Sequence, residues 1–155
     1  ERTELLRSVI VEKMTKSPLH VTIVSRLCEL VAAAAAPGTL VRKEDPMTLA
    51  DSEPEPDIAV VVGRPVDFRA THPSTALLVA EVAVSSEEVD REKIAIYAEA
   101  GVAEFWLVLP LASTIEIYAR PQGSNYRERR TSKAGEMLES TAVPNLRVEI
   151  AALFG

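Results

Sequence analysis

The 155-residue sequence has one cysteine, no long apolar run and no excess of positive charge. The single cysteine, Cys28, cannot form an internal disulfide, and no cluster of cysteine and histidine has the spacing of zinc ligands. The longest apolar run, residues 30–36, is much shorter than the roughly 18 residues that a membrane-spanning helix requires. These absences argue against a disulfide scaffold, a structural zinc site and a membrane protein.

The balance of charge is acidic. Lysine and arginine number 17 and aspartate and glutamate 23, which gives a formal charge of −6. This charge does not favour general attraction to phosphates, so any surface that binds nucleic acid must be local. The candidate surface is the basic group Arg127, Arg129, Arg130 and Lys133, with Arg120 nearby. A solvated strand face is the alternative interpretation of this group.

Length and composition predict one domain that spans residues 1–155. The hydrophobic fraction of 47% is sufficient for a single sizeable core. The sequence starts at Glu1 without a methionine, so we expect some native residues to be missing, and its charged first residues show no export signal. We therefore expect a cytoplasmic location.

Hydrophobic periodicity predicts an alternation of strands and helices. Apolar or β-branched runs predict strands at residues 9–11, 58–62, 76–84, 104–109, 114–119 and 126–131. Residues 18–36 and 87–100 have the spacing of helices. The order of these elements indicates an α/β fold in which helices flank a mixed central sheet.

The first helix is expected to begin near Ser17-Pro18 and to present one apolar stripe to the core. The stripe contains Val21, Val24, Cys28 and Val31. Cys28 is therefore interpreted as a small core residue rather than a nucleophile. After this helix, residues 44–56 are acidic and contain prolines, which is typical of an exposed loop or strand edge.

Glu81 is the one charged residue in the apolar run at residues 76–84. A carboxylate on such a sheet is costly to desolvate unless a metal ion, another cation or hydrogen bonds compensate it. Asp57 comes directly before the strand at residues 58–62, so it can lie beside the end of the strand that carries Glu81. Two such acids within about 4–5 Å would offer oxygen ligands to a divalent cation.

Lys93 lies in the predicted helix that follows Glu81. Asp90, Lys93 and Tyr97 share one face of this helix because they have i, i+3, i+7 spacing. If that face is turned toward the sheet, the ammonium reaches the pocket between the acids, where it can orient water or stabilise charge on a pentavalent phosphorane. An Asp90–Lys93 ion pair on a solvated helix face is the alternative.

Three segments carry a resemblance to a known family. They read Pro-Asp-Ile-Ala-Val-Val at residues 56–61, Leu-Val-Ala-Glu-Val-Ala-Val-Ser-Ser at residues 78–86, and Asp-Arg-Glu-Lys-Ile-Ala-Ile-Tyr-Ala-Glu-Ala-Gly-Val-Ala-Glu-Phe-Trp-Leu-Val at residues 90–108. With these segments the chain resembles the Uma-type family of restriction endonucleases, within the PD-(D/E)xK nuclease superfamily. The resemblance implies a restriction-endonuclease-like core, a Mg²⁺ or Mn²⁺ ion and hydrolysis of DNA phosphodiester bonds.

The resemblance also implies roles for three residues. Asp57 and Glu81 are the implied metal ligands and catalytic acids, and Lys93 is the implied catalytic lysine. The superfamily's lysine would stand at position 83, which is Ala83 here, so Lys93 on the following helix takes over its role.

Four further residues are candidates for the outer shell of the site, namely Glu12, His20, Asp90 and Tyr97. A surface glutamate remains the alternative for Glu12, and a capping or exposed histidine for His20. Ser8 stands where the family often has glycine.

We therefore expect a metal-dependent DNA endonuclease whose substrate is DNA. A noncatalytic nucleic-acid-binding protein, or a dimerisation module that retains the nuclease fold, is the alternative. A homodimer is expected because cutting both strands of a duplex commonly requires two sites related by a two-fold axis.

Overall fold

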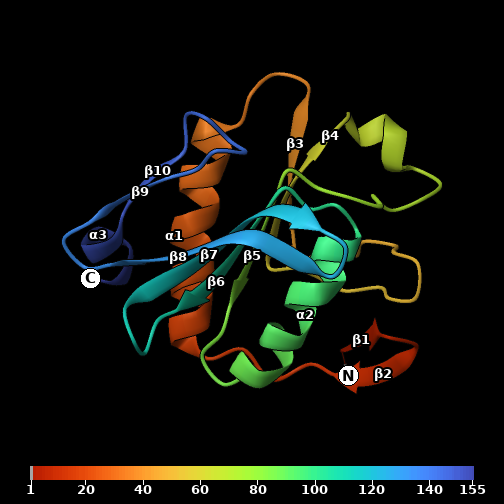
Figure 1. Ribbon diagram of the computed structural model, residues 1–155, viewed down its shortest axis with the longest axis horizontal. Coiled ribbons are helices and arrows are strands. Elements are labelled where there is room, and N and C mark those ends of the chain that lie inside the picture. The colour runs from red at the N-terminus through yellow and green to blue at the C-terminus, as the bar shows by residue number, and fades with distance from the viewer. Residues whose placement is uncertain (1) are drawn as a thin grey trace.

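The centre of the fold is a six-stranded mixed sheet, seen in Figure 1 as the group of strands between the two long helices. The computed structural model describes residues 2–155. In spatial order the strands are β3 (Thr39–Lys43), β4 (Ile58–Val62), β5 (Leu78–Val82), β6 (Glu104–Leu109), β7 (Thr114–Gln122) and β8 (Asn125–Lys133). Strands β5 and β6 are parallel, and the other neighbouring pairs are antiparallel. The predicted mixed sheet is confirmed.

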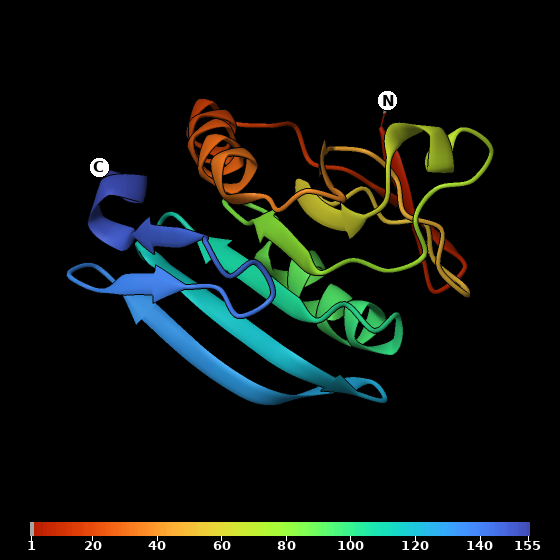
Figure 2. The ribbon, with the colours of Figure 1, turned by 90° about the horizontal axis from the view of Figure 1, so that it is seen from above.

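Helices cover both faces of this sheet (Figure 2). One face packs against α1 (Pro18–Ala34), against α3 (Ile150–Phe154) and against a small antiparallel pair, β9 (Met137–Glu139) and β10 (Arg147–Glu149). The other face packs against α2 (Glu87–Glu99), which follows β5 and leads into β6. The β5–α2–β6 unit is thus a parallel crossover, and its helix packs over β6, β7 and β8, beside the strand that carries Glu81.

Side chains of β5 alternate between the two cores. Leu78, Ala80 and Val82 are buried in the core beneath α1, whereas Val79 belongs to the core beneath α2. Glu81 shares the face of Val79 and is 2% exposed. The predicted alternation is confirmed, and it directs the Glu81 carboxylate toward α2.

Helix α1 has the predicted start, and its apolar stripe differs from the predicted one. The Ser17 side chain caps the helix by accepting a hydrogen bond of 3.1 Å from the amide of His20. The fully buried residues are Ile23, Val24, Leu27 and Val31. Val21 is 50% exposed and Cys28 is only partly buried at the edge of the core. The predicted stripe shares Val24 and Val31 with the buried face but is otherwise turned about the helix axis from it. The reason is that alanine and valine also occupy the sides of this helix.

An N-terminal hairpin precedes α1. It consists of β1 (Thr3–Leu6) and β2 (Val9–Glu12), joined by a two-residue turn in which Arg7 has φ 51° and Ser8 has φ 63°. Such a turn normally contains glycine or asparagine. Because neither residue occurs here, the prediction found β2 and missed β1.

The hairpin contacts the acidic loop at residues 44–57. Backbone hydrogen bonds join Leu5 and Glu53 in both directions, and the loop buries Met47 and Ser52. Of the two predicted interpretations, an exposed loop holds only in part because the hairpin covers some of it, and the Leu5–Glu53 bridge agrees with a strand edge. A short 3₁₀ helix, η1 (Pro65–Phe68), lies in the next connection. Among residues 2–155, no helix combines the length and apolarity needed to cross a bilayer.

Candidate active site

Asp57 and Glu81 meet where β4 begins and β5 ends. They lie one position beyond the paired residues Ile58 and Ala80 of the antiparallel β4–β5 ladder. Each carboxylate accepts a hydrogen bond from a backbone amide across this junction: Glu81 Oε1 accepts from the Asp57 amide at 2.9 Å, and Asp57 Oδ2 accepts from the Val82 amide at 2.7 Å. Both carboxylates are therefore held in fixed orientations by the backbone of the neighbouring strand.

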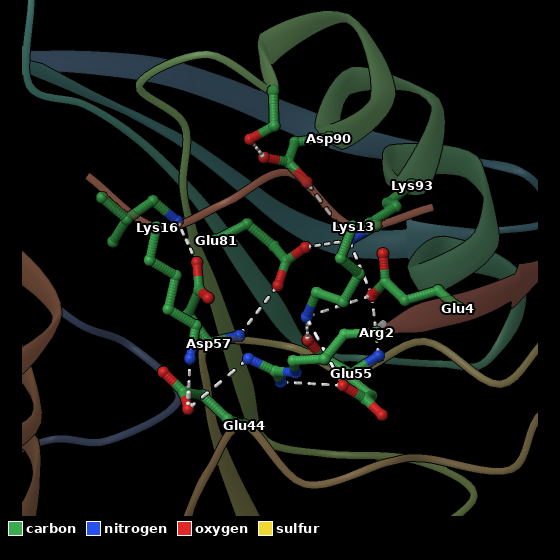
Figure 3. Close-up of polar contacts among 12 residues, drawn as sticks. Arg2, Glu4, Lys13, Lys16, Glu44, Glu55, Asp57, Glu81, Asp90 and Lys93 are labelled. Atoms are coloured by element: carbon green, nitrogen blue, oxygen red, sulfur yellow. Dashed lines mark hydrogen bonds and ion pairs between the residues drawn. The ribbon is translucent and has the colours of Figure 1, made fainter. Parts of the chain in front are cut away.

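Lys93 of α2 extends its ammonium into the same cluster (Figure 3). Lys93 Nζ donates a hydrogen bond to Glu81 Oε2, and it lies 3.0 Å from Glu4 Oε1 and 3.2 Å from Asp90 Oδ1. The Lys93 side chain is 3% exposed, so the alternative of an ion pair on a solvated helix face is wrong. The helix face that carries Asp90 and Lys93 is turned toward the sheet.

Glu4 is a member of the cluster that the sequence did not reveal. It comes from β1, and its Oε1 also accepts a hydrogen bond of 2.8 Å from the Glu55 amide. Glu4 is separated from Lys93 by 89 positions, and no motif links the two. The hairpin brings them together, and β1 itself was not predicted.

A cavity of about 60 Å³ opens beside these side chains. It is lined by Glu4 and Glu12 of the hairpin, by Lys13 and Lys16 before α1, by His20 of α1, by Asp57 before β4, by Glu81 of β5 and by Asp90 and Lys93 of α2, among others. The cavity has room for a hydrated ion or a small polar group beside the carboxylates. It is thus the place where a substrate atom can approach Asp57, Glu81 and Lys93.

The electrostatics of the cluster are set by an imbalance of charge. Glu4, Asp57, Glu81 and Asp90 are buried, and among residues 2–155 the one buried lysine or arginine is Lys93. Burial, followed by the charges of Asp90, Asp57 and Glu4, raises the pKa of Glu81 well above its ordinary value, although Lys93 opposes the rise. Burial would lower the pKa of Lys93, but Glu81, Asp90 and Glu4 raise it well above its ordinary value. Lys93 therefore keeps its proton, and Glu81 is the acid that resists ionisation.

Asp57 has a different environment. Its burial would raise its pKa, but a contact of 3.2 Å with His20 Nε2, the charge of that histidine and the Val82 amide bring the pKa below its ordinary value. An ionised Asp57 beside a Glu81 that resists ionisation gives the pocket two oxygen donors with different proton affinities. Both would be favoured as anions by a bound cation.

The four predicted outer-shell residues occupy different positions. His20 lies beside Asp57, and Asp90 lies beside Lys93 and accepts a hydrogen bond of 2.6 Å from the Ser86 hydroxyl. Tyr97 is fully buried next to the cluster, and its hydroxyl has no hydrogen-bond partner among the described residues. Burial, with the charge of Glu81, raises the pKa of Tyr97 well above its ordinary value. Glu12 is exposed at the rim of the cavity.

Comparison with known proteins identifies the family. A sequence model of the Uma2 family, described as "Putative restriction endonuclease", matches residues 1–151. The chain belongs to the Uma2 family. The match includes the hairpin that carries Glu4, the segment of Lys13 and Lys16, and all residues of the cluster.

A solved structure supports the fold of this Uma2 chain. The crystal structure of a putative nuclease belonging to DUF820, from Anabaena variabilis, superposes with a TM-score of 0.83 at 19% sequence identity. The alignment covers 98% of this chain and 89% of the other. No curated protein matches the chain. At this identity the likeness concerns the fold, so the chemistry of the site depends on the residues of this chain.

Two carboxylates of this Uma2 chain fit a hard cation. Within residues 2–155, no three His, Cys, Asp or Glu side chains form a group arranged to hold a metal ion. Mg²⁺ is usually bound by one or two carboxylates and keeps several waters, with substrate phosphates as further ligands. The oxygen donors of Asp57 and Glu81 beside a polar cavity suit that manner of binding.

The basic group on β8 lies away from this pocket. Arg129 bonds Glu116 at 3.0 Å and stacks over Tyr118, whereas Arg130 bonds the Glu139 carbonyl at 2.9 Å. Successive residues of a strand point to opposite faces, so Arg127, Arg129 and Lys133 lie on one face of β8 and Arg130 on the other. The structure therefore divides the predicted group between two faces.

Proposed function

We propose that this Uma2 chain is a metal-dependent DNA endonuclease of the PD-(D/E)xK type, which hydrolyses phosphodiester bonds. Membership of the family supports a nuclease. The observation that carries the finer proposal is the junction of Asp57, Glu81 and Lys93 at one cavity, where three buried carboxylates contact a single buried ammonium and Asp57 adjoins Glu81. Such a cluster has a deficit of positive charge where a phosphate and its cation would bind.

Asp57 and Glu81 are the residues that would hold Mg²⁺ or Mn²⁺. When bound, such an ion polarises the phosphate and lowers the pKa of a water molecule. Lys93 donates hydrogen bonds to negative oxygens at the cavity, and it stabilises charge that develops on the phosphate during attack. Because Glu4 and Asp90 also contact Lys93, the ammonium is held in one orientation.

The surroundings of Ala83 support the assignment of the catalytic lysine to Lys93. Ala83 is 4% exposed and packs in the core beneath α2, so a lysine there would be buried among apolar side chains. Lys93, one element later, reaches the Glu81 carboxylate from above the sheet. The proposal thus gives Lys93 the role that a lysine at position 83 has in the superfamily.

Cleavage of supercoiled plasmid tests the proposal. Wild type with Mg²⁺ or Mn²⁺ is expected to produce open circles and then linear DNA, and EDTA is expected to stop the reaction. Glu81→Gln and Lys93→Gln are expected to reduce cleavage by at least about 100-fold, because each removes a group that acts on the transition state. Glu88→Gln is the matched control, since Glu88 is exposed on the same helix.

Three outcomes separate the candidate functions. Cleavage by wild type and by Glu88→Gln, but not by Glu81→Gln, supports the endonuclease. DNA binding without cleavage under any metal condition would favour the noncatalytic alternative. A change in stability alone, with neither binding nor cleavage, would favour the dimerisation module. Sedimentation velocity of the wild type checks the expected homodimer.

A further inference from the structure

Three basic side chains at the cavity come from the N-terminal part of the chain. Lys13 and Lys16 line the cavity, on the segment that joins β2 to α1. Arg2 lies next to them, as Figure 3 shows. Lys13 is near enough to Asp57 for its charge to help lower the pKa of that carboxyl. These cations lie beside the residues that would act on a phosphate.

Each of these cations is paired with a carboxylate of the acidic loop. Lys16 Nζ lies 2.6 Å from Glu44 Oε2, Lys13 Nζ lies 3.7 Å from Glu55 Oε2, and Arg2 Nη2 lies 2.9 Å from Glu55 Oε2. The Lys16 and Glu44 side chains are 28% and 26% exposed. Ion pairs with this exposure contribute little to stability. At Lys16 a phosphate can therefore replace the Glu44 carboxylate at small cost, whereas Lys13 Nζ also donates a hydrogen bond of 2.9 Å to the Glu55 carbonyl and lies 3.9 Å from Glu4 Oε1.

We propose that Lys13 and Lys16 bind the backbone phosphates that flank the cleaved one, and that Glu44 competes with the nucleic acid for Lys16. This assignment rests on the proposed nuclease function and names the surface that receives its substrate. The segment 13–16 crosses from the hairpin to α1 at the rim of the cavity. Both lysines line the same cavity as Lys93, so they are available to phosphates next to one that is bound there.

The basic group on β8 is less suited to this role. Strand β8 is three strands from β5 in the sheet, which is about 14 Å at the usual strand spacing. Arg129 and Arg130 are engaged with Glu116 and with the Glu139 carbonyl, on opposite faces of the strand. Phosphates bound to the N-terminal lysines would therefore be closer to the cleaved bond than phosphates bound to β8.

The salt dependence of DNA binding tests the assignment. A fluorescein-labelled duplex is titrated with protein at several KCl concentrations, in EDTA and again with Ca²⁺, and binding is followed by anisotropy. Each lost phosphate contact reduces the slope of log K against log salt by about 0.9 for duplex DNA. Lys16→Gln is expected to show this smaller slope and weaker binding. Lys16→Arg is expected to recover the slope and the affinity of the wild type.

Matched variants on β8 separate the effect of the position of a charge from the effect of net charge. Lys133→Gln removes the same charge as Lys16→Gln and is expected to leave the slope unchanged. Glu44→Gln is expected to strengthen binding, because it frees Lys16. Glu128→Gln, which frees Arg120 from a pair at 3.0 Å, makes the same change in net charge and is expected to have no such effect.

The outcomes distinguish this inference from the proposed function. If wild type binds the duplex and Lys16→Gln keeps the wild-type slope, the assignment is overturned and the nuclease proposal stands. If instead Lys133→Gln reduces the slope of log K against log salt, the phosphate contacts lie on β8. If wild type binds no DNA at low salt in either condition, both the assignment and the nuclease proposal fail.

Discussion

Helix α2 connects two ion clusters whose charges are balanced in opposite ways. In the Glu116 cluster, Arg91 of α2 and Arg129 of β8 share the Glu116 carboxylate, which also accepts a hydrogen bond of 2.6 Å from the Tyr118 hydroxyl. In the Glu81 cluster, Lys93 contacts the carboxylates of Glu81, Glu4 and Asp90, and Asp57 lies beside Glu81. Two guanidinium groups thus contact the one buried carboxylate of Glu116, and Arg91 also pairs with the exposed Glu87 at 2.7 Å. Around Lys93, by contrast, three carboxylates contact one buried ammonium.

The pKa values of the two glutamates follow from this difference. Hydrogen bonds from Arg91, and also from Tyr118, lower the pKa of Glu116 to about 2, against the opposing effect of burial. Burial and neighbouring carboxylates raise the pKa of Glu81 well above its ordinary value. The Glu116 cluster is therefore complete as it stands and holds α2 to the sheet. The Glu81 cluster would be stabilised by a further cation, which is the property expected of a metal and phosphate site.

Replacement of Lys93 by methionine is expected to have the largest effect on stability. Lys93→Met keeps much of the volume and removes the charge that compensates Glu81, Glu4 and Asp90. Removing one partner of a buried ion pair typically costs about 3–5 kcal/mol. Urea unfolding at pH 8 is expected to show a loss in this range.

The difference in the free energy of unfolding between wild type and Lys93→Met is expected to shrink as the pH falls. Without the lysine, Glu81 is buried at lowest cost when protonated. Its pKa in the folded variant therefore exceeds the pKa in the unfolded chain by even more than it does in the wild type. A group with a raised folded pKa contributes stability at low pH that is lost as the pH rises. A variant as stable as wild type at pH 8, or one equally destabilised at pH 5 and pH 8, would contradict the charge balance inferred for this cluster.

Glu116→Gln is expected to have the next largest effect. The glutamine leaves Arg91 and Arg129 without their shared carboxylate, which should reduce the free energy of unfolding by about 1.5–3 kcal/mol near pH 7. Because the folded pKa of Glu116 is about 2, its contribution is complete above the ordinary value and disappears as the pH falls toward 2. Urea unfolding of both proteins should therefore show their difference narrowing below about pH 4.5. A difference that widens in acid would refute the Glu116 assignment.

Ser8→Gly addresses the hairpin that brings Glu4 to the Glu81 cluster. Ser8 has a positive φ of 63°, which costs roughly 1–2 kcal/mol for a residue with a Cβ atom. Glycine is expected to raise stability by about 1 kcal/mol at most, less the entropy that it adds to the unfolded chain. Ser8→Ala keeps the Cβ atom and serves as the control in thermal unfolding. Equal melting temperatures for Ser8→Gly and Ser8→Ala would argue against strain at this turn.

The meeting of Asp57 and Glu81 could be predicted from the sequence because it depends on local patterns. Each residue is adjacent to, or part of, a strand whose apolar run is unmistakable, and β4 and β5 are neighbours in the chain and in the sheet. Lys93 follows from the helical spacing of Asp90, Lys93 and Tyr97 together with the crossover that sets α2 on the face of the sheet to which Glu81 points. Alternation and helical periodicity are short-range properties, so they survive in a single sequence.

Other parts of the site depend on contacts between distant segments. Glu4 reaches Lys93 only through a hairpin whose turn contains Arg7 and Ser8, and no glycine marks that turn. The buried face of α1 was predicted with the wrong rotation because valine and alanine surround the helix, and packing against the sheet decides which of them are buried. The role of Lys16 as a neighbour of Glu44 likewise follows from the fold of the acidic loop.

Titration of Mn²⁺ into the protein by calorimetry tests the central claim most directly, namely that the Glu81 cluster accepts a further cation. Wild type and Glu116→Gln are expected to bind one ion per chain, and Glu81→Gln is expected to bind none while remaining folded by circular dichroism. Absence of binding in wild type, or undiminished binding in Glu81→Gln, would contradict the account and leave Lys93 and its three carboxylates as a purely structural cluster.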